Sequence, residues 1–496
     1  MRHSQRARLC AAGLLAVSSI IGGAAQAAAG TPFVPNPSAT GGVVFAAGRN
    51  GDHAVIDTDG THYYIDRYDD QGNHLYNTPL LVATAPEVPT GVAIDGFGRY
   101  AVLTTMHPNA SPGRQAYLTV YNRDGSIHLA RTQVNTTAST DVAGNFVAMN
   151  RAGQIALNWF QWNAVSKKFE FRVKTLSATG AATSADVLIS PSAAGVVVQG
   201  MGLDDAGNVA VEWVNIPGGT ALPTIQHQRF YNNGTALTAA TQVNTVGTTI
   251  LNSGLGIDGH GDTVVAFMAS DTSGNGIYGQ RFNNLGAKVG GLFRINDSIA
   301  GEQSSPSVGM TEEGAFTAAW ISQPTTSSPY AAMMKQYTSA GVPFANEQTI
   351  ASPATVSAFP TAVLTSPAGV DLLVWGNAGG YVENYTMDTQ PAVANASSGV
   401  PMANNSATTG QWRYFRIAVP ANATTLTIAA TGNATGNGDL YAMLGALPSL
   451  TNTQYKSTKA GNTETLQITG VPPGDWYVGL YATAAFSGTT LTITAQ

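Results

Sequence analysis

The stretch Asp204-Asp205-Ala206-Gly207-Asn208-Val209-Ala210-Val211-Glu212-Trp213 joins a polar turn and a glycine to an alternating run. The run ends in a bulky residue six positions after the glycine, as it also does from Gly153 to Trp159 and from Gly314 to Trp320. Alternation with a period of two is typical of a β-strand, and glycine suits the positive φ that hairpin turns demand. The stretch therefore predicts a β-hairpin that recurs along the chain.

The glycines of these turns recur at a nearly constant spacing. The first series comprises Gly51, Gly98, Gly153, Gly207, Gly261, Gly314 and Gly369. A second series falls between its members, at Gly72, Gly125, Gly180, Gly234, Gly286 and Gly341. Two series with one period predict a repeat of about 53 residues that occurs about seven times.

Each repeat has the pattern of four short strands, which predicts an all-β fold with a seven-bladed β-propeller over residues 28–388. A repeated sandwich would need about seven strands per unit. The bulky residues, such as Trp159 and Trp213, fit a blade core better than a sugar-stacking platform. We expect the fourth strands at Val134-Asn135-Thr136, Val243-Asn244-Thr245 and Ile295-Asn296-Asp297.

The seventh repeat shows strands near 360–366, 370–376 and 380–387 but no clear fourth strand. The segment Thr31-Pro32-Phe33-Val34-Pro35 is a candidate for that strand, and would close the ring by joining the two ends of the chain in one sheet.

Composition agrees with this fold. Charged residues make up only 10% of the 496 residues, and the 55 glycines outnumber them. Solvent-facing helices draw heavily on Glu and Lys, and disordered chains combine high charge with few apolar residues. The composition therefore argues against a helical bundle, a coiled coil and a disordered chain.

Residues 1–27 have the pattern of a secretory signal peptide. Three arginines precede a short apolar stretch, and Ala25-Gln26-Ala27 is a small-x-small cleavage site. The alternative, a membrane anchor, needs about 20 apolar residues, so we expect no transmembrane segment. Cleavage leaves 20 basic against 29 acidic residues, which disfavours nucleic acid as a partner. It also removes Cys10, the one cysteine, so the mature chain has no disulfide.

Two parts of the chain resemble known families. The stretches Ile277–Phe282, 305–309 and 318–320 are similar to propeller-like repeats of exported bacterial proteins. The region 399–496 resembles the bacterial pre-peptidase C-terminal domain, after a linker at 389–398. Its matching motifs are Trp412, Tyr414-Phe415, Leu426-Thr427-Ile428, Gly438-Asp439-Leu440-Tyr441 and Pro473-Gly474-Asp475-Trp476-Tyr477-Val478.

This second resemblance implies a jelly-roll-like β-sandwich that aids secretion or attachment to an insoluble substrate. Many members carry a cysteine pair, which this sequence lacks, and some relatives bind collagen or calcium. Asp439 matches the family aspartate and is a weak metal candidate. Its alternative role is that of a turn carboxylate that accepts backbone N–H groups.

Familiar catalytic motifs are missing from the sequence. It holds no His-Glu-x-x-His and no Gly-x-Ser-x-Gly, and the mature chain offers no cysteine nucleophile. The stretches Asp57-Thr58-Asp59-Gly60 and Asp258-Gly259-His260-Gly261-Asp262 faintly resemble calcium loops. Neither continues into the full ladder of ligands, and the second aligns with the repeated turn. We therefore assign no catalytic or cofactor residue, with calcium left open.

The sequence favours a secreted, non-catalytic binding or scaffolding protein, although enzyme activity stays open. The propeller would recognise an extracellular polysaccharide or protein, since rigid rings present loops for recognition. The alternative is a secreted hydrolase or lyase on polysaccharide or protein, with its site in the propeller funnel. Convergent ionisable groups at the funnel would favour the enzyme. We expect a monomer, with the periplasm or the cell surface as alternative locations.

Overall fold

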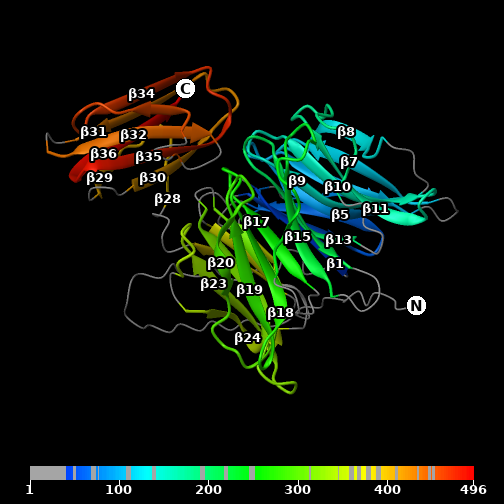
Figure 1. The fold of residues 1–496 in the computed structure, drawn as a ribbon. Coiled ribbons are helices and arrows are strands. Elements are labelled where there is room, and N and C mark those ends of the chain that lie inside the picture. Colours follow the sequence, from blue (N-terminus) through cyan, green and yellow to red (C-terminus); the bar gives the residue numbers. More distant parts are fainter. Residues whose placement is uncertain are drawn as a thin grey trace. The chain divides into compact units, whose positions relative to one another are not determined.

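The structure is a computed structural model, and its described residues contain strands and no helix (Figure 1). The described ranges are 41–48, 52–68, 74–75, 78–107, 113–136, 141–189, 196–216, 222–244, 252–311, 314–343, 346–356, 362–365, 370–375, 381–386, 393–407, 412–432, 435–444, 448 and 453–496. The all-β prediction is thus confirmed. The predicted signal peptide, Cys10 and the candidate closing segment 31–35 lie outside these ranges.

The chain divides into two compact units, one of Met1–Asp95 with Arg99–Met387 and the other of Gly96–Gly98 with Asp388–Gln496. In the described part of the first unit, consecutive strands pair in sequence order and form seven groups, which we call blades 1 to 7. A short parallel pairing between Gly274–Asn275 and Gly301–Glu302 also joins blades 5 and 6.

The strands of the first unit have the following bounds. Blade 1 comprises β1 (Gly41–Ala47), β2 (His53–Thr58), β3 (His62–Tyr68) and β4 (Leu80–Thr84). Blade 2 comprises β5 (Glu87–Ile94), β6 (Tyr100–Met106), β7 (Gln115–Tyr121) and β8 (Ile127–Gln133). Blade 3 comprises β9 (Val142–Met149), β10 (Ile155–Asn163), β11 (Lys168–Leu176) and β12 (Val187–Leu188). Blade 4 comprises β13 (Val196–Leu203), β14 (Val209–Asn215), β15 (Thr224–Phe230) and β16 (Thr241–Gln242).

The remaining blades continue this order. Blade 5 comprises β17 (Ser253–Ile257), β18 (Thr263–Ser270), β19 (Gly274–Phe282) and β20 (Lys288–Arg294). Blade 6 comprises β21 (Gly301–Met310), β22 (Phe316–Gln323), β23 (Tyr330–Tyr337) and β24 (Gln348–Val356). Blade 7 comprises β25 (Ala362–Thr365), β26 (Val370–Trp375) and β27 (Tyr381–Thr386).

The first strands of the blades form a closed circuit. Each of β1, β5, β9, β13, β17 and β21 contacts the first strand of the next blade, and β25 contacts β1. Sheets arranged in a ring with their first strands innermost make a β-propeller. We call the interface between two consecutive blades a seam.

Glycine turns set the ends of the strands, as the two series predicted. The ten described members of the series all have positive φ, between 72° and 95°. L-residues with a side chain rarely adopt this left-handed region, so glycine fits these turns best. Gly51, Gly72 and Gly369 lie outside the described residues.

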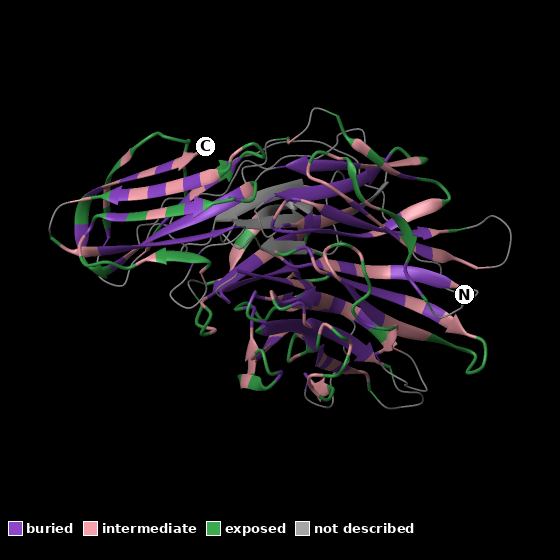
Figure 2. Ribbon diagram, turned by 90° about the horizontal axis from the view of Figure 1, so that it is seen from above, coloured by how far each residue is buried: buried purple, intermediate pink, exposed green. Residues whose placement is uncertain are grey.

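The seams hold the core of the first unit. Buried residues follow the middle strands, whereas exposed residues gather at turns and loops (Figure 2). Trp159 and Trp320 are fully buried and Trp213 is 3% exposed, which confirms the interpretation of these residues as blade core. Burial of such side chains contributes roughly 2–3 kcal/mol each to folding.

The fourth strands differ from the prediction, because they end just before the Val-Asn motifs. Strand β16 ends at Gln242, and the buried Val243 then donates its N–H to Ile225 at 2.8 Å. The Asn244 side chain in turn accepts the Ile225 N–H at 2.8 Å. The motif therefore replaces strand pairing with a side-chain bond that caps the third strand.

The second unit consists of two sheets around one apolar core. One sheet has the order β28 (Val393–Asn395), β30 (Trp412–Val419), β35 (Gly474–Ala484), β32 (Asn437–Leu444) and β33 (Tyr455–Ser457). The other has the order β29 (Met402–Ala407), β36 (Phe486–Ala495), β31 (Thr425–Thr431) and β34 (Glu464–Thr469). Phe415, Ile428 and Trp476 are buried in the shared core.

The expected linker at 389–398 is in part a strand. Val393–Asn395 forms β28, which pairs in parallel with Tyr414–Arg416 of β30. The backbone groups of this short stretch are thus bonded within the second unit. The described residues contain no helix that could span a membrane.

Candidate functional site

The turns between first and second strands gather at one end of the ring, which we call the turn face. The N–H of Asp205 donates to the carbonyl of Gly259 at 3.0 Å, and the Asn150 side chain donates to the carbonyl of Asp204 at 3.0 Å. The opposite end, which we call the loop face, carries the hairpins between second and third strands. Loops on these two faces are where a rigid ring presents residues for function.

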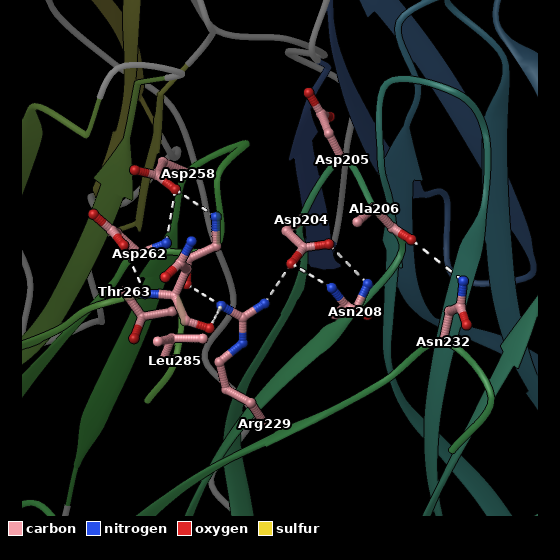
Figure 3. A network of polar contacts seen from close by, with 12 residues as sticks. Asp204, Asp205, Ala206, Asn208, Arg229, Asn232, Asp258, Asp262, Thr263 and Leu285 are labelled. Carbon is pink, nitrogen blue, oxygen red and sulfur yellow. Dashed lines mark hydrogen bonds and ion pairs between the residues drawn. The ribbon is translucent and has the colours of Figure 1, made fainter. Parts of the chain in front are cut away.

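The calcium-like stretch Asp258–Asp262 is one copy of the repeated turn on the turn face. Asp258 Oδ1 accepts the N–H of Gly261 at 2.7 Å and that of Asp262 at 2.8 Å (Figure 3). The equivalent acceptors in other blades are Asp95, Asn150, Asp204 and Thr311, whose side chains accept the N–H four residues later. Asp, Asn and Thr side chains all accept this N–H, so the role of the position is to cap the turn.

Arg229 fastens blade 4 to blade 5 on the turn face. Its Nη2 lies 2.5 Å from Asp204 Oδ2, and its Nη1 donates to the carbonyls of Gly261 and, at 2.9 Å, Asn284 (Figure 3). Thr175 and Arg281 occupy the equivalent positions of blades 3 and 5, and each donates to a carbonyl of the next blade. The network in Figure 3 is therefore a structural fastening.

The loop face carries carboxylates at the starts of first strands, and in its described part these are held by partners. Glu87 receives Nε and Nη2 of Arg131, each at 3.1 Å. Asp141 receives Nε and Nη2 of Arg114 at 2.7 and 2.8 Å, and this bonding holds the pKa of Asp141 below its usual range. Glu302 accepts the Asn275 amide at 2.6 Å. A general acid would need a raised pKa, which this pairing of Asp141 opposes.

An aromatic cluster that the sequence reasoning missed lies on the hairpin of β10 and β11. The Phe169 ring lies 5.5 Å from the Phe160 ring and 5.2 Å from the Trp162 ring, and Phe171 lies 5.9 Å from Phe160. Phe169 is 48% exposed. The available signal was the alternation of Phe160 with Trp162 and of Phe169 with Phe171, which places all four on one face of the hairpin.

Two strongly perturbed groups, Glu212 and His227, are closed to substrate. Glu212 and His227 lie in the seam between blades 4 and 5, where they are 0% and 1% exposed. A cavity of about 220 Å³ between blades 1 and 2 is lined by residues that include Arg67, Tyr100 and Asp124. It is smaller than the roughly 300–1,000 Å³ of ordinary ligand sites.

Asp439 lies within strand β32 and not in a turn. Its Oδ1 accepts the Asn437 amide at 3.0 Å, and its Oδ2 accepts the Thr483 hydroxyl at 2.9 Å. The donors are thus side chains, in place of the expected backbone N–H groups. Nowhere in the described ranges do three or more His, Cys, Asp or Glu side chains come together as a metal site.

Two proteases each match a short part of this chain. Alkaline serine exoprotease A of Vibrio alginolyticus is 32% identical over 95 residues, which are 19% of this chain and 17% of that protein. The extracellular protease of Xanthomonas campestris pv. campestris is 36% identical over 95 residues, 19% of this chain and 16% of that protein. The chain thus matches about a sixth of the length of these relatives.

The first unit has distant structural neighbours. An ulvan lyase of a polysaccharide lyase family superposes with a TM-score of 0.45 at 13% identity, over 74% of this chain and 95% of the lyase. A likeness of this degree gives no information about a substrate. In the second unit, residues 413–482 match the family model of the bacterial pre-peptidase C-terminal domain. The C-terminal region therefore resembles that domain, as its sequence motifs predicted.

Proposed function

We propose that this chain is a secreted, non-catalytic binding protein. Its first part, residues 28–388, is a seven-bladed propeller, which recognises an extracellular polymer or protein. Its second unit, residues 399–496, is a jelly-roll-like sandwich that aids secretion or attachment. The names of the two relatives, both proteases and one of them extracellular, support an exported context for this chain.

The aromatic hairpin of blade 3 is the observation that carries the proposal. Each of its four rings lies within 6 Å of at least one other, and Phe169 remains half exposed. Clustered, partly exposed aromatic side chains are enriched at binding surfaces, because they offer large contact area at little entropic cost. The Arg114 guanidinium lies 4.9 Å from the Phe160 ring centre and adds a polar edge.

The arrangement of charge supports binding over catalysis. The carboxylates Glu87 and Asp141 on the loop face are each engaged by an arginine through two nitrogens. Such bidentate pairs are strong and fix geometry, so both carboxylates are occupied before any substrate arrives.

An array of glycans and matrix proteins probed with the full chain tests this proposal. The matched variants are Phe169→Ala, which removes a ring of the cluster, and Val165→Ala, which removes an exposed aliphatic group from the same hairpin. We expect wild type and Val165→Ala to bind one class of polymer and Phe169→Ala to bind at least tenfold more weakly. Absence of all binding contradicts the proposal, and release of cleaved product supports the hydrolase or lyase alternative.

A further inference from the structure

One seam of the ring differs chemically from the others. At the position where the second and third strands pair inside the seam, blades 1, 2 and 6 carry apolar pairs, namely Ile56 with Ile65, Leu103 with Leu118 and Ala319 with Met334. Blade 4 carries Glu212 with His227. Burying two ionisable groups costs free energy that an apolar pair does not, and among the described strand pairs at this position, including Asn158 with Val173 in blade 3, only that of blade 4 consists of two ionisable residues.

Glu212 is enclosed by blade 5. Its Oε1 accepts the Ser253 hydroxyl of β17 at 2.5 Å, while its Oε2 has no hydrogen-bond partner among the described residues. A Cβ at Gly200 would meet Glu212 Oε2 at 3.4 Å and the Leu255 side chain at 2.6 Å, so glycine there allows β17 to pack closely. Burial raises the pKa of Glu212 to about 8, against the opposing effect of the Ser253 hydrogen bond.

His227 faces the same seam. Its Nε2 lies 3.1 Å from the Thr263 hydroxyl, its ring stacks on Phe282 at 4.3 Å, and its Nδ1 has no hydrogen-bond partner within the described ranges. Burial lowers the pKa of His227 to about 3, and the positive charge of Arg229 adds to the effect. The groups that face the pair from β13, β17, β18 and β19 are thus uncharged, and the Arg229 charge is itself engaged by Asp204.

We propose that the seam between blades 4 and 5 is a pH-sensitive joint of the ring, which stays closed while Glu212 and His227 are both neutral and opens when either becomes charged. A charged side chain in this seam has no counter-ion, and an unpaired buried charge strongly favours exposure to water. This inference is independent of the proposed ligand.

Proton linkage gives the shape of the response. Glu212 has a raised pKa in the closed seam, so closure weakens as pH rises from about 4.5 towards 8. His227 has a lowered pKa, so closure weakens as pH falls from about 6.5 towards 3. Between these limits the two effects cancel, since open and closed states bind one proton each. Opening is therefore lowest near pH 4.5–6.5 and rises about eightfold from pH 6.5 to pH 8 and from pH 4.5 to pH 3.

Hydrogen exchange of the full chain tests the joint. We expect amides of β17 to exchange about eightfold faster at pH 8 than at pH 6.5, after correction for the intrinsic rate. Amides of β9, whose seam with blade 2 holds the apolar Leu103 against Gly144, are the internal control and stay unchanged. Equal behaviour of β9 and β17 would overturn the proposal.

Three variants separate the two groups. Glu212→Gln removes the rise towards pH 8 and keeps the rise towards pH 3, whereas His227→Leu does the reverse. Glu212→Leu with His227→Leu copies the apolar pair of blade 2 and gives a flat profile, which keeps the test open if a single variant folds poorly. Glu302→Gln, which changes an exposed carboxylate, is the control, and we expect it to show the same pH profile of exchange as wild type. An alkaline rise that survives both Glu212→Gln and the double variant would refute the inference.

Discussion

Arg229 and Asp204 form an ion pair in which Nη2 lies 2.5 Å from Oδ2, and their side chains are only 0% and 4% exposed. Removing one partner of a buried pair leaves the other charge without compensation. We expect Arg229→Met to lower the free energy of unfolding by about 3–5 kcal/mol. Urea unfolding followed by tryptophan fluorescence measures the change.

The matched control for this variant is Arg281→Met. Arg281 occupies the equivalent position in blade 5, is only partly buried and donates to the carbonyls of Ser339 and Ala340. Its loss leaves no buried carboxylate behind, so we expect the free energy of unfolding to fall by only about 1 kcal/mol. Equal losses for the two variants would show that the Asp204 partner adds nothing.

Asp258→Asn should make the chain more stable at neutral pH. Burial, followed by the charge of Asp262, raises the pKa of Asp258 to about 6. The stabilisation by the protonated group is therefore complete below pH 3.8 and is lost as pH rises through 6. Asparagine keeps the cap, because Asn150 accepts the Gln154 N–H at 2.9 Å in blade 3. We expect a gain of roughly 2–3 kcal/mol at pH 7.5.

The pH series of melting temperatures checks the sign of this effect. The difference between Asp258→Asn and wild type should vanish near pH 3.5. A constant difference across the series would mean that ionisation of Asp258 is not the cause.

Two adjacent glycines of β20 isolate the effect of backbone conformation. Gly290 has a φ of 69°, Gly291 does not have a positive φ, and a Cβ at either position would meet no atom within 4 Å. We therefore expect Gly290→Ala to cost about 1–2 kcal/mol, whereas Gly291→Ala changes stability by less than about 0.5 kcal/mol. Thermal melting of the two variants tests this, and a reversed order would contradict it.

Asp439→Asn should weaken the second unit without changing its response to calcium. Both carboxylate oxygens accept hydrogen bonds, from Asn437 and Thr483, and an amide can accept only one of them. We expect a loss of about 1–2 kcal/mol. Melting of the full chain with calcium or with a chelator gives the readout, and calcium stabilisation of wild type alone would make Asp439 a ligand.

The repeated turns were predictable from the sequence, whereas the partners across the seams were not. Gly207 and Gly234 predict their turns because the local backbone geometry alone favours glycine there. Arg229, by contrast, contacts Asn284 at a separation of 55 residues, which depends on how two sheets stack. Composition could not show this, because an arginine in an alternating strand looks the same whether it faces water or a neighbouring blade.

The candidate site could not be predicted from the sequence for a related reason. The alternation of Phe169 and Phe171 predicts a shared strand face but not its exposure, which depends on how far β10 and β11 extend. Glu212 and His227 become neighbours only through the register of β14 and β15. In the same way, Val243-Asn244 resembles a strand, and its role as a cap appears only once its contact with Ile225 is known.

Three of the bonds between blades share a direction. The side chains of Thr175, Arg229 and Arg281 donate to the carbonyls of Asn232, Asn284 and Ala340, which lie 57, 55 and 59 residues further along the chain. A growing chain delivers its amino-terminal parts first, so each of these donors waits for the next blade to arrive. A chain truncated after blade 4 or blade 5 would lack the carbonyl that accepts from Arg229 or from Arg281. Folding of each following blade therefore completes the hydrogen bonds of the blade before it.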